Sequence, residues 1–172
     1  MNKKLVYLLT LLVSATLFLT SCGDDDPCKE VDCGANGTCF DGACVCDPGY
    51  EGSDCLTEWS AKFVSGTYIG KSTCLDASEQ YQGSITRKSG TEIRINEFGG
   101  YTGQNHIDAT VKLADASAES ALAIEIVNFN DGFNRVFNGT GVLANRVLTI
   151  TYTVDYNDGG PVENCVETLT LN

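Results

Sequence analysis

The sequence predicts a mainly β protein in two parts: a small disulfide-rich module, then an antiparallel, eight-stranded, up-and-down β-barrel, with a β-sandwich as the alternative. Three observations support this prediction. Six of the nine cysteines lie between residues 28 and 55. Beyond residue 57, apolar and polar residues alternate with a period of two in roughly eight short runs. Turn-forming Asn, Asp and Gly residues separate these runs.

The first 21 residues have the organisation of an export signal. Lys3 and Lys4 give a positive start, residues 5–19 form an apolar run, and small residues lead to Cys22. The run is shorter than the roughly 20 residues that a bilayer-spanning helix needs, so a permanent membrane helix is the weaker interpretation.

The tetrapeptide Leu19-Thr20-Ser21-Cys22 resembles the lipobox of bacterial lipoproteins. The resemblance implies that Cys22 carries a diacylglycerol, that residues 1–21 are removed, and that the new amino group takes a further fatty acid such as palmitate. The alternative is an ordinary signal peptide with an accidental cysteine. Several acyl chains together would hold the protein stably on a membrane.

Residues 22–27 form a short acidic tether that contains Gly23-Asp24-Asp25-Asp26. The tract is similar to the acidic signal of surface-exported lipoproteins in some Gram-negative bacteria. We therefore expect an exported, lipid-anchored outer-membrane protein that is exposed at the cell surface. A simple solvated spacer is the alternative, and the sequence does not decide between the inner and outer leaflet.

The six clustered cysteines are separated by 4, 5, 4, 1 and 8 residues, and six cysteines allow 15 pairings. The end of the cluster, Cys44-Val-Cys46-Asp-Pro-Gly-Tyr50-Glu-Gly52-Ser-Asp-Cys55, resembles the EGF-like domain. The resemblance covers residues 28–56 and implies the pairs Cys28–Cys39, Cys33–Cys44 and Cys46–Cys55. So small a segment needs such bridges because it cannot bury enough apolar area.

Metal binding is the rival explanation for clustered cysteines. The cluster contains no Cys-x-x-Cys pair and no histidine, which disfavours zinc. The segment between Cys39 and Cys44 is too short for the ligands of a calcium-binding EGF-like domain, so we expect no defined calcium site.

The C-terminal part, residues 57–172, supplies the alternating runs. In residues 146–156, Leu148, Ile150, Tyr152 and Val154 share one face and threonines occupy the other. Strands are expected near residues 66–74, 81–88, 91–98, 105–113, 121–128, 133–143, 146–156 and 162–171. Short connections between consecutive strands favour an antiparallel meander.

Cys74 and Cys165 are the only cysteines of this part, one in the first expected strand and one in the last. A bridge between them would tie the first strand to the last, as closure of a barrel requires. Two free thiols are the alternative.

Gly66-Thr67-Tyr68 at the start of the first strand is similar to the Gly-x-Trp signature of lipocalins, with tyrosine in place of tryptophan. The partner arginine of that family is missing near the last strand, so ligand binding does not carry over. Five side chains are expected to face inward and either line a pocket or fill a core: Tyr68, Ile107, Val111, Ile124 and Ile150.

The formal net charge is −12, which repels phosphate backbones and argues against nucleic-acid binding. His106 is the only histidine, and no serine-hydrolase motif or phosphate loop is present. We therefore predict no catalytic residue, no cofactor and no resident metal.

Two functional hypotheses from different classes remain, with a third that is purely structural. The first is a non-catalytic, surface-tethered binding module in which the EGF-like unit is a rigid spacer that presents the barrel to a protein, a glycan or a small apolar ligand. The second is a hydrolase acting on glycans through a pair of carboxylates. The third is a structural envelope component.

In every case we expect Trp59, the only tryptophan, to pack at the junction between the two parts.

Overall fold

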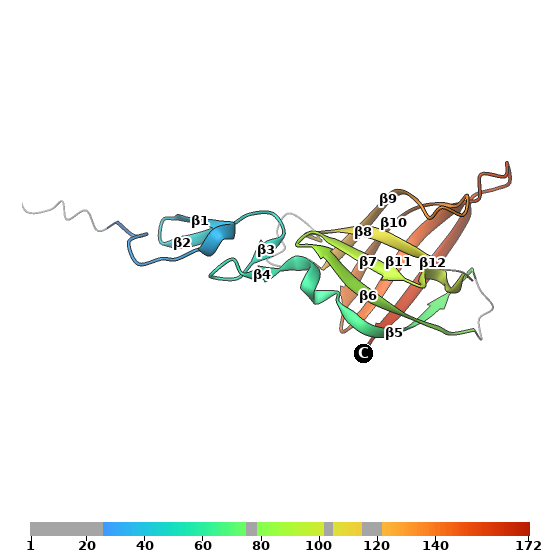
Figure 1. Ribbon diagram of the computed structural model, residues 1–172, viewed down its shortest axis with the longest axis horizontal. Coiled ribbons are helices and arrows are strands. Elements are labelled where there is room, and N and C mark those ends of the chain that lie inside the picture. Colours follow the sequence, from blue (N-terminus) through green and yellow to red (C-terminus); the bar gives the residue numbers. More distant parts are fainter. Residues whose placement is uncertain (1–25, 75–78, 102–104, 115–121) are drawn as a thin grey trace, which may run out of the picture.

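The computed structural model describes residues 26–74, 79–101, 105–114 and 122–172. The expected signal peptide and the expected lipidation site at Cys22 lie outside these ranges. Within them, no helix is long and apolar enough to cross a bilayer. The cysteine module and the barrel follow one another along the long axis of the molecule (Figure 1).

The cysteine module consists of a one-turn 3-10 helix and two short hairpins. Their bounds are η1 (Gly34–Asn36), β1 (Gly37–Phe40), β2 (Ala43–Cys46), β3 (Tyr50–Glu51) and β4 (Thr57–Glu58). Strand β1 pairs with β2, and β3 pairs with β4, both antiparallel. Few side chains of the module are buried, Cys33 and Cys55 among them, so its disulfides supply much of its stability.

The C-terminal part is a closed antiparallel barrel of eight strands. The strands are β5 (Ser65–Ser72), β6 (Tyr81–Ser89), β7 (Glu92–Asn96), β8 (His106–Lys112), β9 (Ala123–Asn130), β10 (Val136–Ala144), β11 (Val147–Asp155) and β12 (Glu163–Leu171). Each strand pairs with the next in sequence, and β12 pairs back with β5. The predicted eight-stranded barrel is therefore confirmed, and the sandwich alternative was wrong because the two end strands hydrogen-bond to each other.

All eight expected strands are present, and most of their ends are shifted by one to three residues from the expected bounds. Turn geometry accounts for two of these shifts. Strand β7 ends at Asn96 because Glu97 adopts a left-handed backbone, and the chain then forms η3 (Phe98–Gly100). Strand β10 begins only at Val136 because residues 131–135 form the β9–β10 turn. In both places the turn geometry overrides an apolar pattern that runs on into the connection.

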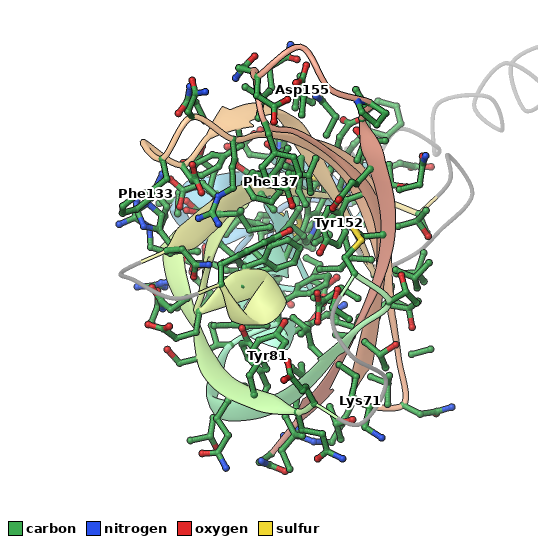
Figure 2. The ribbon with its side chains drawn as sticks, turned by 90° about the vertical axis from the view of Figure 1, so that its right-hand side faces the viewer. Lys71, Tyr81, Phe133, Phe137, Tyr152 and Asp155 are labelled. Carbon is green, nitrogen blue, oxygen red and sulfur yellow. A yellow bond between two sulfur atoms is a disulfide. The ribbon has the colours of Figure 1, made fainter. Side chains whose placement is uncertain are left out.

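The barrel interior is filled with apolar side chains from inward-facing strand positions, and a 3-10 turn lies at each end. The turn η2 (Trp59–Lys62) precedes β5 on the side of the cysteine module, and Phe63, directly after η2, is fully buried. The turn η3 crosses the opposite opening, which faces the viewer in Figure 2, and its Phe98 is also buried. This packing agrees with the filled interiors of other small barrels.

The two parts of the chain are joined without a flexible linker. The Trp59 amide donates a hydrogen bond to the Gly49 carbonyl (2.9 Å), and the Ser60 amide donates to the Gly90 carbonyl in the β6–β7 turn (3.1 Å). A Cβ atom added to Gly49 would lie 2.8 Å from the side chain of Thr91, so the module touches the barrel directly. The Trp59 side chain is half-buried against the barrel core.

The fluorescence of Trp59 reports on this junction. We expect iodide to quench Trp59 several-fold less efficiently in the native protein than in the reduced, denatured chain, because the indole packs against buried side chains. Stern–Volmer constants measure the difference, and the single tryptophan makes the assignment unambiguous. Equal quenching in the two states would mean that the two parts swing independently.

Candidate functional site

The interior of the barrel was the first candidate for a binding site. The structure places Tyr68, Ile107, Val111, Ile124 and Ile150 inside the barrel, each at most 1% exposed. All five belong to one hydrophobic cluster. They therefore pack against one another as a core, and the other interpretation, an open apolar pocket, does not describe them.

One charged residue lies among these apolar side chains. Glu167 of β12 is 0% exposed and points into the barrel. The Tyr81 hydroxyl donates to its Oε1 (2.5 Å), and the Tyr152 hydroxyl donates to its Oε2 (3.3 Å). The Tyr81 oxygen in turn accepts a hydrogen bond from the Gly99 amide of η3 (3.0 Å). The cluster of Glu167, Tyr81 and Tyr152 is therefore linked to η3. Figure 2 shows Tyr81 and Tyr152 on opposite sides of η3.

Burial changes the acid–base properties of this cluster. It raises the pKa of the Glu167 carboxyl to about 7, although hydrogen bonds from Tyr81, Ser72 and Tyr152 act in the opposite direction. Burial, and then the nearby Glu167 charge, raise the pKa of Tyr81 well above its usual range, so this phenol stays protonated and remains a donor. The Glu167 carboxyl has no access to solvent, so an external substrate cannot reach it in this structure. We therefore interpret Glu167 as a structural group of the barrel core.

Two glycines make room for the tyrosines beside Glu167. A Cβ atom on Gly70 would lie 2.4 Å from the Tyr81 ring, and one on Gly83 would lie 2.4 Å from the Tyr68 hydroxyl. The two rings pack edge to face with their centroids 6.0 Å apart. The sequence Gly66-Thr67-Tyr68 at the start of β5 therefore supplies a ring that packs against Tyr81, the hydrogen-bond partner of Glu167.

The sequence analysis missed Glu167, although the sequence contains a signal for it. In β12, the buried positions 165, 167, 169 and 171 alternate with more exposed neighbours and carry Cys, Glu, Leu and Leu. A carboxylate at an inward-facing position of such a pattern indicates a buried, hydrogen-bonded group.

Eight cysteines form four disulfides. The pairs are Cys28–Cys39, Cys33–Cys44, Cys46–Cys55 and Cys74–Cys165. Glu163 lies near the last pair, and the three side chains are close enough to share an ion. Metal binding needs thiolates, however, and these two sulfurs are bonded to each other.

A shallow groove lies on the outer surface of the barrel, across β9, β10, β11 and β12, the wall drawn in orange to red in Figure 1. Its volume is about 440 Å³. The backbone of inward-facing residues forms its floor, and outward-facing side chains form its walls: Glu125, Val127, Asn138, Thr140, Thr151, Thr153 and Asn164. This groove is the candidate ligand site that the geometry offers.

The family model of the teneurin-like EGF domain matches residues 28–58. The N-terminal module is EGF-like. Its three disulfides are the pairs that the resemblance implies, and its last hairpin, β3–β4, leads directly into η2. The EGF-like module is thus continuous with the barrel through Trp59 and Ser60.

Two solved structures are similar to this chain. A redesigned β-barrel matches with a TM-score of 0.40 at 15% identity, over 67% of this chain and 97% of the other. A candidate outer membrane protein of Bacteroides fragilis matches with a TM-score of 0.34 at 19% identity, over 67% of this chain. The match spans about half (53%) of the length of the Bacteroides fragilis protein. No curated protein matches the chain.

Proposed function

We propose that this chain is a lipoprotein, cut before Cys22 and acylated on it, that holds a non-catalytic binding domain at the surface of an outer membrane. In this proposal the EGF-like module is a rigid spacer and the lipocalin-like barrel is the domain presented. The membrane is the partner on the lipid side, and a protein, a glycan or a small apolar molecule is the partner on the barrel side.

The observation that carries the proposal is the junction between the modules. The hydrogen bonds Trp59 to Gly49 and Ser60 to Gly90 are reinforced by two ion pairs, Lys62 with Glu51 and Arg87 with Glu58. Each partly exposed pair adds at most about 1 kcal/mol, so the pairs set orientation more than stability. A spacer that is fixed in this way keeps the barrel at a defined distance from the anchor.

Two further features support the proposal. Four disulfides fit an oxidising compartment outside the cytoplasm, which agrees with the export signal that the sequence predicts for residues 1–21. The barrel interior is packed, and Glu167, the one strongly perturbed carboxyl among the residues that the structure describes, has no solvent access. A non-catalytic role for the outer surface therefore fits the geometry best.

Intact-mass spectrometry of the protein from a lipoprotein-processing Gram-negative host tests the anchor. We expect a mature chain that begins at Cys22, carries fatty acyl groups and partitions into the detergent phase. The Cys22→Ser variant is the matched control and should stay in the aqueous phase, because serine offers no thiol for acylation. A wild-type protein that keeps residues 1–21, carries no acyl group and remains in buffer would refute the proposal.

Protease treatment of intact cells tests the surface location separately. We expect external protease to release or degrade the wild-type barrel while a periplasmic marker stays intact. Protection of the barrel in intact cells, together with cleavage after the outer membrane is opened, would place the protein on the inner leaflet.

A further inference from the structure

The outer groove has two parallel walls. Glu125, Thr140 and Thr151 lie side by side on adjacent strands, because Thr140 pairs in register with both Glu125 and Thr151. On the other side, Asn138 pairs with Thr153, and Thr153 pairs with Asn164. The two rows are two residues apart along the strands, which is about 6.8 Å, and neighbours within a row are about 4.8 Å apart. The groove thus runs across the strands and suits an extended ligand.

The groove carries unused hydrogen-bonding groups. Asn138 is partly engaged, since its Oδ1 accepts the Asn128 amide (2.7 Å) at the bulge of β9–β10. Thr140 and Thr151 are exposed, and Asn164 is exposed beside them. No hydrogen bond between described residues uses the side chains of these three. Each hydroxyl can donate and accept, and the amide offers both a donor and an acceptor.

The charge of the groove is small for so acidic a protein. Its walls contain one charged side chain, Glu125, and this carboxylate is paired with Lys112 (3.0 Å). The whole chain carries a net charge of −12, which disfavours anionic ligands. A neutral ligand is not repelled by this net charge, and it does not need a charged partner in the walls of the groove.

We propose that this groove binds a neutral oligosaccharide, which it holds through the hydroxyls of Thr140 and Thr151 and the amide of Asn164. This inference rests on the proposed binding function and names its ligand class and place. Sugar hydroxyls are both donors and acceptors, so they match the walls of the groove, and exposed Val127 at its edge offers an apolar contact. An extended peptide fits less well, because a closed barrel offers no strand edge for backbone pairing.

Isothermal titration with four neutral probes tests the proposal: cellohexaose, xylohexaose, maltohexaose and mannohexaose. The full chain is used, in a detergent without a sugar headgroup. We expect at least one probe to bind, and the Thr140→Val, Thr151→Val double variant to bind it about tenfold more weakly, because two hydrogen bonds are lost. Valine keeps the shape and the strand preference of threonine, so the barrel should remain folded. If the double variant does not fold, each single variant should weaken binding about threefold.

The matched control changes the same residue type on the same surface. Thr149→Val with Thr168→Val alters a registered pair on β11 and β12 that lies outside the groove, and we expect unchanged affinity. Failure of all four probes at millimolar concentration, or equal losses in the two double variants, would overturn the proposal. An acylated protein that binds a peptide but no sugar would also overturn it, while the surface tether would stand.

Discussion

Replacing Cys74 and Cys165 together with alanine is expected to lower the free energy of unfolding by about 4–5 kcal/mol. Their disulfide closes a loop with a sequence separation of 91, and the entropy that such a bridge removes from the unfolded chain grows with loop length. Alanine is preferred to serine because Cys165 is 1% exposed and a buried hydroxyl would add its own cost. Denaturant titration under non-reducing conditions measures the loss.

The position of the bridge makes the effect specific to the barrel. The seam between β12 and β5 has only five pairs in register, and the disulfide continues this seam beyond Ser72. The Cys28→Ala, Cys39→Ala variant is the control, since its loop has a separation of 11 and predicts a smaller loss of about 3 kcal/mol. Equal losses in the two variants would show that loop length does not control the stability of this chain.

Glu167 is expected to make the protein less stable as the pH rises from about 4.5 to 8. In the fold, burial raises the pKa of its carboxyl from 4.5 to about 7, so between these values the folded chain binds more protons than the unfolded chain. The contribution of Glu167 is complete below pH 4.5 and is lost as the pH passes 7. The shift corresponds to about 3 kcal/mol.

The Glu167→Gln variant isolates this effect from the other carboxylates. Its side-chain amide is neutral at every pH. It can accept a hydrogen bond from the Tyr81 hydroxyl and can donate one to the hydroxyl of Tyr152 or Ser72. The unfolding free energy of the wild type minus that of the variant should fall by about 3 kcal/mol between pH 4.5 and 8. A flat profile of this difference between pH 4.5 and 8 would contradict a raised pKa of the Glu167 carboxyl.

The strands could be predicted from the sequence because their signal is local. In β11, Leu148, Ile150, Tyr152 and Val154 alternate with threonines and are all buried. The same alternation in β8 placed Ile107 and Val111 inside the barrel. Strand ends were harder to predict, since the left-handed backbone at Glu97 depends on the turn that η3 makes across the barrel opening.

The candidate sites could be predicted only in part. The inward position of Glu167 follows from alternation, but its partner Tyr81 lies 86 residues earlier in the chain. The groove depends on the register that sets Thr140 beside Thr151, and a shift of one residue would point these side chains into the core. Register between strands is a property of the closed sheet, and the period-two pattern alone does not specify it.

The sequence by itself determined that this chain has an EGF-like module, eight strands and an inward face for clearly alternating strands such as β8 and β11, because cysteine spacing and alternation act between near neighbours. The tertiary structure decided that the interior is a solid core, that Glu167 is buried among tyrosines, and that a polar groove crosses the outside of β9–β12. Glu167 meets Tyr81 from a strand 86 residues away, whereas the groove depends on the register between neighbouring strands. Closure of the barrel and pairing of its strands determine both arrangements.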